Sequence, residues 1–312
     1  MTNDELASHN ESRTPRPESR AVHRPVLLRE TLEHLKVKPD GTYIDATLGS
    51  GGHAEAILQA LTTGRLLGID RDAVALELAC QRLQVFGEKL IVRQGNFAGI
   101  DALHAASGLP PADGILADLG VSSMQLEDAS RGFSFNLPGP LDMRMDTSSG
   151  ITAEEIVNRM PERELADLIY KLGEERHSRR IARALVKARP NRTTTELAQV
   201  VTRAIPSRAG LYQIHPATRT FMALRLAVNQ ELESLEQFLP KALGLLAPLG
   251  RLVVLSFHSL EDRIVKHAFL AWQREGKARV LTKKVIRPSA EELEQNPRAR
   301  SAKLRATEKT RD

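Results

Sequence analysis

Residues 42–54 read TYIDATLGSGGHA and residues 65–70 read RLLGID, and these two stretches decide the fold. Each contains a short apolar run that ends in an aspartate, Asp45 or Asp70, which is typical of a buried strand that ends at a polar edge. The glycine cluster Gly49–Gly52 follows the first run, and apolar residues at helical spacing come after it. A strand, a glycine turn, a helix and a second strand are the beginning of a parallel α/β sheet.

The alternation of apolar strands and helices continues up to Asp118 and then stops. Leu90–Arg93 and Gly114–Asp118 are the third and fourth predicted strands, whereas residues 122–220 contain loop-forming residues followed only by helical patterns. Strand character returns at Arg251–Phe257. This interrupted alternation predicts an α/β fold with a Rossmann-like, doubly wound, mostly parallel sheet that carries a helical insert domain.

Apolar spacing also predicts two helices that pack on the sheet. One covers Asp72–Leu83 and has Val74, Leu78 and Cys80 on its buried side. The other is a single long helix over about residues 219–247, directly before the last strand.

These patterns predict four parts of the chain. We expect a disordered N-terminal tail over 1–22 and a core domain formed by 23–121 and 219–290. The helical insert covers 122–218, and a basic C-terminal tail covers 291–312.

The composition excludes several classes of protein. The chain has 312 residues, of which 41% are hydrophobic and 27% are charged, so it can form a sizeable core. Its longest dense apolar run, Leu252–Phe257, is far shorter than the roughly 20 residues needed to span a bilayer, and the polar N-terminus lacks the apolar segment of a signal sequence. A single cysteine excludes an intrachain disulfide framework and a thiolate metal cluster. We therefore expect a cytoplasmic protein without a membrane segment or a metal.

The positive charge is concentrated in two regions. The net charge is +5, and residues 151–220 alone contribute +5 while residues 263–312 contribute +8. Basic regions of this kind suit a polyanionic partner such as RNA or DNA. The alternative is a basic chain end that is merely solvated, and charge alone does not separate the two.

The glycine turn is compatible with two kinds of cofactor. Gly49–Ala54 (GSGGHA) fits the relaxed dinucleotide pattern G-x-G-x-x-A, and Asp70 stands about 20 residues beyond it, where that pattern has its ribose-binding acid. A nicotinamide dehydrogenase is therefore one reading, and a turn that only packs helix against strand is another.

Three further features favour S-adenosylmethionine as the cofactor. Asp45 lies just before the glycines, where a carboxylate attracts a cationic amino-acid group and repels a pyrophosphate. Gln94–Phe97 adds a polar edge and an aromatic face at the end of the third strand, and Asp118 ends the fourth. Each carboxylate taken singly is equally well explained as a helix cap or turn residue, but together they mark the edge where open sheets bind ligands.

The chain resembles the RsmH (MraW) family of bacterial methyltransferases. The resemblance covers about residues 22–290 and rests on these segments: HRPVLL at 23–28, DATLGSGGH at 45–53, GIDRD at 68–72, ADLGVSSMQLED at 117–128, RGFSF at 131–135, GPLDMRMD at 139–146, GEERHSRRIARA at 173–184, HPATRTFMALRLAVN at 215–229 and LSFHSLEDRIVK at 255–266. It implies a cytoplasmic enzyme that uses S-adenosylmethionine to methylate N4 of a cytidine in the decoding centre of 16S rRNA.

The resemblance also implies which residues bind the cofactor. The family's pocket maps onto Gly51, Gly52, His53, Asp70, Phe97, Asp118 and Gln125. In this mapping the first three contact the methionine end, Asp70 accepts from the ribose hydroxyls, and Phe97 packs on the adenine. The helical insert corresponds to the family's second domain, which is expected to help hold the RNA.

The substrate-binding and catalytic residues are less directly indicated. The sequence after Asp118 lacks the Pro-Pro-aromatic motif of DNA amino-methyltransferases, so Asp118 itself is our candidate acceptor for the cytosine amine. Phe133 is a candidate stacking residue or a buried hydrophobe, and Arg219 is a candidate phosphate contact or an interdomain ion-pair partner. His258 borders the cleft as a substrate ligand or as a hydrogen-bonded structural residue.

The expected partner is 16S rRNA or the small ribosomal subunit, and the sequence leaves the oligomeric state open, a homodimer included. Two other functions stay compatible with the residues alone. One is the NAD-dependent dehydrogenase, and the other is a non-catalytic RNA-binding factor in ribosome assembly.

Overall fold

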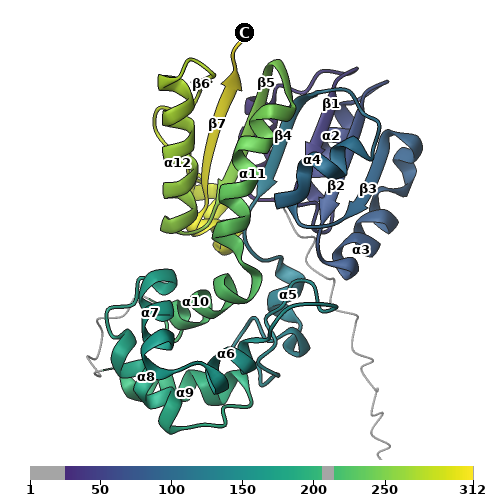
Figure 1. Ribbon diagram of the computed structural model, residues 1–312. Helices are drawn as coiled ribbons and strands as arrows, with labels where there is room; N and C mark the ends of the chain where they lie inside the picture. Colours follow the sequence, from purple (N-terminus) through teal and green to yellow (C-terminus); the bar gives the residue numbers. More distant parts are fainter. Residues whose placement is uncertain (1–24, 206–213, 312) are drawn as a thin grey trace, which may run out of the picture.

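The computed structural model describes residues 25–205 and 214–311, and the predicted tail over 1–22 lies outside them. Its centre is a seven-stranded sheet in the order β3-β2-β1-β4-β5-β7-β6 (Figure 1). The strands are β1 (Thr42–Asp45), β2 (Arg65–Asp70), β3 (Leu90–Gln94), β4 (Ala112–Asp118), β5 (Leu246–Ser256), β6 (Ala278–Val280) and β7 (Lys303–Lys309). The doubly wound, Rossmann-like fold class is confirmed.

The parallel strands bring distant aspartates to one edge of the sheet. β1 pairs in parallel with β2 and β4, and its last residue, Asp45, lies opposite Gly68 and Leu116. Asp70 and Asp118 end their strands two residues further on. All three carboxylates therefore lie at the carboxyl edge, which is where open α/β sheets bind ligands.

Helices cover both faces of the sheet (Figure 1). Neighbouring strand residues alternate between the two faces, as Tyr43 and Ile44 do, and both faces are buried. One face is covered by α1 (Leu28–Leu35), α2 (Gly52–Ala60) and α3 (Ala73–Leu83). The other is covered by α4 (Ile100–Ala105), α11 (Glu231–Leu245) and α12 (Ser259–Arg274).

The predicted helix over 72–83 forms, but its buried side is different from the expected one. Val74, Leu78 and Cys80 are exposed. The residues packed on the sheet are Ala75, Leu76, Ala79 and Leu83. The predicted burial of Val74, Leu78 and Cys80 is wrong, because the side of the helix that faces the sheet carries the small residues Ala75 and Ala79.

The end of the chain is part of the sheet. The prediction of a basic tail over 291–312 is wrong, because β7 lies between β5 and β6 and pairs with both in antiparallel fashion. Leu304 and Ala306 are fully buried on one face, and Lys303 and Arg305 alternate with them and pair with Asp262 of α12. This alternation of apolar and charged residues is typical of a strand, and the abundance of Lys and Arg concealed it. A short helix, α13 (Ala290–Gln295), precedes β7.

The chain between β4 and α11 folds into a helical unit that lies below the sheet in Figure 1. It contains α5 (Ser123–Glu127), α6 (Ala153–Arg159), α7 (Glu162–Gly173), α8 (Ser178–Lys187), α9 (Thr194–Ala204) and α10 (Thr218–Asn229). These helices enclose an apolar cluster of their own.

The long helix predicted over 219–247 is two helices. The chain breaks at Gln230, which adopts the left-handed conformation with φ 49° and ψ 44°. The side chain of Arg225 spans the break with a two-pronged contact to Glu231. Phe221 and Leu224 of α10 pack in the helical cluster, so the helical unit ends near residue 229 and the expected boundary at 218 is corrected.

Candidate active site

The turn between β1 and α2 leaves backbone groups accessible at the carboxyl edge. Gly49 and Gly51 have φ values of 52° and 82°, a region that side chains rarely adopt. A Cβ at Gly49 would approach only the Thr47 carbonyl oxygen, at 3.9 Å. α2 begins at Gly52 without a side-chain cap, so the first N–H groups of the helix have no partner from a capping side chain.

Asp70 ties this turn to the next one. Its Oδ2 accepts from the Gly49 N–H at 2.8 Å and its Oδ1 accepts from the Asp72 N–H at 2.9 Å. Burial raises its pKa despite these hydrogen bonds. Each carboxylate oxygen can still accept from a hydroxyl, since it has a second lone pair.

His53 is buried in the first turn of α2 and has two different neighbours. Its Nε2 lies 3.0 Å from the Val26 carbonyl oxygen, and its Nδ1 lies 3.5 Å from Oδ2 of Asp118. A carbonyl only accepts, so Nε2 carries the proton and Nδ1 faces the carboxyl group.

Two aspartates of the edge are held with raised pKa values. Burial raises the pKa of Asp45 to about 7, although the Thr47 N–H donates to it at 3.1 Å. Burial, followed by the charges of Asp45 and Glu261, raises the pKa of Asp118 to about 8. Oδ1 of Asp118 is buried and has no hydrogen-bond partner among the described residues. The cluster is thus short of positive charge, which a cationic ligand would supply.

Phe97 lies three residues after the end of β3 and packs edge-on against Phe238 of α11, with ring centroids 5.2 Å apart. The preceding Asn96 accepts from the Ala98 N–H and donates to Ser234 of α11. The position of the aromatic ring is therefore fixed by α11 as well as by its own strand.

Gln125 has both ends of its amide engaged within the protein. Its Nε2 donates to Asp72 Oδ2 at 2.8 Å, and its Oε1 accepts from the Ser122 N–H at 3.0 Å. It therefore lies beside the Asp70 turn, held by the protein and only 6% exposed, while its second N–H and second oxygen lone pair are not used by these two bonds.

Of the three substrate candidates, Arg219 and His258 come near each other through Glu174, which contacts both Arg219 and Ser259, and Phe133 lies apart. Phe133 is only 6% exposed and packs in the helical cluster, so no ring face is open to a base and its stacking role is corrected to that of a buried hydrophobe. Arg219 donates to the Glu174 carbonyl oxygen at 3.1 Å, within the helical unit.

His258 caps the N-terminus of α12, and its Nε2 lies 3.1 Å from Oε1 of Glu261. Burial would raise the pKa of Glu261, but the contact with His258 and the charge of Arg225 bring it below its usual value. Glu261 is thus a buried negative charge close to Asp118. Sequence reasoning missed it, and the three-residue spacing of a capping box in HSLE was the available signal.

Glu174 connects the helical unit to α12 beside this site. It accepts from the Ser259 hydroxyl and, at 3.0 Å, from Arg263. Both partners lie within five residues of His258. The beginning of α8, just after Glu174, is therefore close to the edge that holds Asp118 and Glu261.

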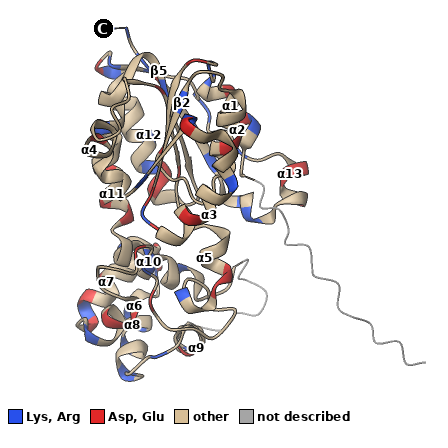
Figure 2. Ribbon diagram, turned by 90° about the vertical axis from the view of Figure 1, so that its right-hand side faces the viewer, with Lys and Arg blue, Asp and Glu red and all other residues tan. Residues whose placement is uncertain are grey.

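The outer face of α8 is basic (Figure 2). Ile181, Ala182 and Leu185 are its buried residues. Its exposed cations are Arg176, just before the helix, Arg179, Arg180, Arg183 and Lys187. Only Arg183 has an acidic partner in the described parts of the chain, Glu162 at 3.5 Å. From residue 176 to 187 the stripe runs for about 16 Å at the helical rise, and it fits a polyanion.

Within residues 25–205 and 214–311, no three His, Cys, Asp or Glu side chains are grouped so that they could hold a metal ion. In the same residues, no helix combines the length and apolarity needed to cross a bilayer.

Comparison with known proteins relates the whole chain to one family. The sequence model of the MraW methylase family matches residues 20–310. The chain is 51% identical over 306 residues to the ribosomal RNA small subunit methyltransferase H of Syntrophobacter fumaroxidans, covering 92% of this chain and 96% of that protein. It is 52% identical over 288 residues to the protein of the same name from Cyanothece sp., covering 92% and 95%.

Solved structures overlap less closely. A putative rRNA methylase from Clostridium thermocellum aligns with a TM-score of 0.44 and 13% identity, covering 92% of this chain and 100% of that one. The fold class therefore rests on the strand order and register of the chain itself.

Proposed function

The chain belongs to the MraW methylase family, and from this we propose that it transfers the methyl group of S-adenosylmethionine to N4 of a cytidine in the decoding centre of 16S rRNA. The close relatives named rRNA small subunit methyltransferases make it an S-adenosylmethionine-dependent rRNA methyltransferase. The methylated atom, the methylated nucleotide and the roles of single residues are what we propose beyond this. We also infer that the protein acts in the cytoplasm.

The carboxylates at the strand ends carry this proposal. Asp45 and Asp118 have raised pKa values, and Oδ1 of Asp118 is buried without a partner. Such a cluster suits a cofactor with positive charge and opposes a pyrophosphate. This argues against the dinucleotide reading of the glycine turn.

The residues present fit S-adenosylmethionine. The N–H groups of Gly52 and His53, at the uncapped start of α2, would hold its amino-acid end, Asp70 would accept from the ribose, and Phe97 would contact the adenine. When bound, this cofactor supplies a methyl group that is already activated by a positively charged sulfur.

Asp118 would act on the cytosine amine. The lone pair of that amine is delocalised into the ring, so an acceptor that grips an N–H and aligns the nitrogen raises the rate through positioning. The amine loses a proton when the new N–C bond forms, and a carboxylate whose pKa lies near neutrality can take it. While Asp118 is protonated, its carboxyl O–H would donate to Nδ1 of His53, whose Nε2 is held by the Val26 carbonyl.

The helical unit would hold the RNA. We assign the catalytic unit to residues 25–121 with 230–311 and the substrate unit to 122–229. The exposed cations of α8 would contact phosphates next to the site, because α8 begins beside the Glu174–Ser259 contact. Target bases that are paired or stacked must be exposed before the reaction, and contacts to the flanking backbone would hold the RNA in that state.

Asp118→Asn tests the catalytic assignment. We expect kcat for transfer of labelled methyl groups to small-subunit rRNA to fall at least about 100-fold, while loss of the charge weakens binding of S-adenosylmethionine by a clearly smaller factor. An equal loss of kcat and affinity would mean that Asp118 only binds the cofactor. Asp101→Asn is the matched control, since this carboxylate is exposed and pairs with Lys241 on α11.

A parallel titration with NAD tests the alternative. Binding of NAD in place of S-adenosylmethionine would overturn the proposed function. Mass spectrometry of the methylated nucleoside would identify the accepting atom.

A further inference from the structure

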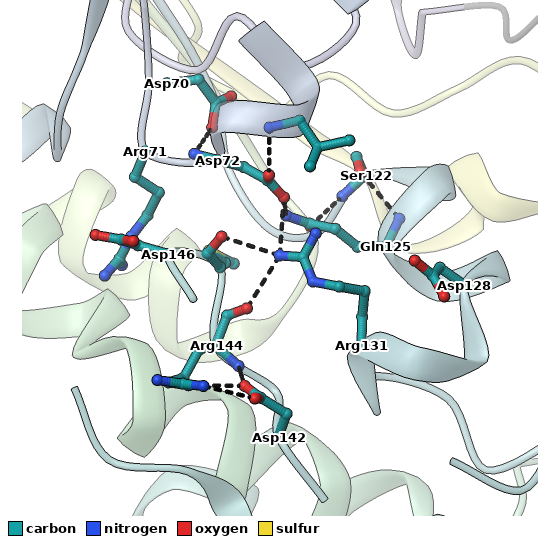
Figure 3. A network of polar contacts seen from close by, with 12 residues as sticks. Asp70, Arg71, Asp72, Ser122, Gln125, Asp128, Arg131, Asp142, Arg144 and Asp146 are labelled. Atoms are coloured by element: carbon teal, nitrogen blue, oxygen red, sulfur yellow. Dashed lines mark hydrogen bonds and ion pairs between the residues drawn. The ribbon is translucent and has the colours of Figure 1, made fainter. Parts of the chain in front are cut away.

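The turn between β2 and α3, residues 70–72, is bonded to the helical unit (Figure 3). Asp72 is only 3% exposed. Its Oδ1 caps α3 by accepting from the Val74 N–H at 3.1 Å. Its Oδ2 accepts from Gln125 Nε2 at 2.8 Å and lies 2.9 Å from Nη2 of Arg131. The carboxylate of Asp72 therefore joins the N-terminus of α3, in the sheet domain, to two side chains of the helical unit.

Arg131 extends the connection further into the helical unit. The same Nη2 contacts the carbonyl oxygens of Arg144 at 3.0 Å and Met145 at 2.9 Å. The side chain of Arg131 is 13% exposed and its guanidinium lies 5.8 Å from the centre of the Phe133 ring. Breaking a buried charge pair of this kind leaves an uncompensated charge, so Arg131 and Asp72 hold each other firmly.

Arg71 reaches the break between the two helices. Its Nη1 donates to the carbonyl oxygen of Asn229 at 2.9 Å, directly before Gln230. The Asn229 side chain in turn accepts from the Met145 N–H and donates to the Met143 carbonyl, both at 2.8 Å. The turn is thus bonded both to the 141–146 loop, through Arg131, and to the residue at which α10 ends.

The same turn holds Asp70. The Asp72 N–H donates to Asp70 Oδ1, while Gly49 donates to Oδ2. Any displacement of Asp72 therefore changes the position of Asp70 and of the glycine turn. No side chain of the helical unit bonds to Asp70 directly in the described residues, so the influence passes through Asp72.

We infer that Asp72, Gln125 and Arg131 are positioning residues that couple the cofactor site to the docking of the helical unit. The inference rests on the proposed function in that Asp70 is taken to bind the ribose. Gln125, which the family resemblance maps to the cofactor pocket, is assigned to this group because its Nε2 donates to Asp72 and its side chain is only 6% exposed. Coupling is reciprocal, so cofactor binding also stabilises the 141–146 loop against the sheet domain.

Asp72→Asn is the decisive variant. Asn caps helices as well as Asp does, so α3 keeps its cap while the charge opposite Arg131 is lost. By isothermal titration we expect affinity for S-adenosylmethionine to fall by a factor within the usual range of coupling between sites, roughly five- to 150-fold. Arg131→Gln should lower the affinity for S-adenosylmethionine by a similar factor. The double variant should bind the cofactor no more weakly than the single variant with the lower affinity.

Arg144→Gln is the matched control. Arg144 pairs with Asp142 at 2.8 Å, a distance close to that of the Arg131–Asp72 pair. The control therefore removes an arginine–carboxylate pair from the 141–146 loop. The side chain of Arg144 does not contact Asp72. Its cofactor affinity should stay within about twofold of the wild type.

Amide hydrogen exchange gives the readout that a purely structural role would not change. In the wild type, S-adenosylmethionine should slow exchange in peptides covering 141–146, and in Asp72→Asn this slowing should be lost even at saturating cofactor. Equal slowing in both proteins, or an affinity of Asp72→Asn within twofold of the wild type, would overturn the coupling. A wild type that does not bind S-adenosylmethionine would instead refute the proposed function.

Discussion

Nδ1 of His53 lies 3.5 Å from Oδ2 of Asp118, so the first turn of α2 faces the end of β4 across the carboxyl edge of the sheet. Nε2 of the same ring is held by Val26, just before α1. The carboxyl group whose pKa is raised to about 8 thus has a fixed imidazole on one side and an unpartnered oxygen on the other.

This arrangement predicts that cofactor binding releases protons. In the free protein at pH 7 Asp118 is mostly protonated, and a cation next to it favours the ionised form. Affinity for S-adenosylmethionine should therefore rise with pH up to about 8. Titration calorimetry at pH 7 in buffers of different ionisation enthalpy measures the release. S-adenosylhomocysteine has a neutral sulfur and is the control, and equal release with both ligands would contradict the prediction.

Asp45→Asn should stabilise the ligand-free protein. The folded-state pKa of Asp45 is raised to about 7 by burial, so its favourable contribution is complete below the unfolded pKa and is lost as pH rises to about 7. The advantage of Asn should accordingly grow over this window and then level off, reaching about 4 °C in the unfolding temperature. Asp101→Asn is the comparison, because its hydrogen bond with Lys241 lowers the pKa and no stabilisation is expected. Thermal unfolding between pH 5 and pH 8 checks both variants.

Neutralising the basic face of α8 should weaken RNA binding in a salt-dependent way. Arg176→Gln combined with Arg180→Gln removes up to two phosphate contacts, so the slope of log K against log salt should decrease by about 1–2. Binding of small-subunit rRNA at several salt concentrations provides the measurement. Arg29→Gln with Arg274→Gln removes two exposed cations from the sheet domain and should leave the slope unchanged. The same decrease in both double variants would show a general charge effect with no specific role for α8.

Leu304→Ala should destabilise the protein although it lies eight residues from the last residue of the sequence. Leu304 is fully buried in the sheet, and removal of a large core side chain costs about 2–4 kcal/mol. Denaturant unfolding measures the loss. Arg311→Ala, at an exposed position beyond β7, should be neutral, and a neutral Leu304→Ala would mean that β7 contributes little to stability.

The strand ends could be predicted from the sequence because short-range patterns define them. Apolar runs that end at Asp45, Asp70 and Asp118 specify buried parallel strands, and parallel strands share a carboxyl edge. The carboxylate cluster followed from that rule alone. The glycine turn was recognisable for the same local reason, since few residues other than glycine adopt the backbone conformation seen at Gly49 and Gly51.

Contacts between distant segments were beyond such patterns. The burial of Ala75 in place of Val74 depends on how α3 packs against the sheet. The burial of Leu304 depends on the pairing of β7 with the edge of β5 that does not pair with β4. The break at Gln230 follows from the bonds of Asn229 with residues 143–145. None of these is encoded within a single helix or strand.

The sequence by itself determined the order of the strands β1 to β5 and the chemical character of the edge where they end, because both depend on the periodicity and type of neighbouring residues. Only the tertiary structure decided that Gln125 and Arg131 meet at Asp72, 53 and 59 residues away along the chain. Buried polar groups must find partners when water is removed, and which partners they find depends on how the two parts of the chain pack against each other.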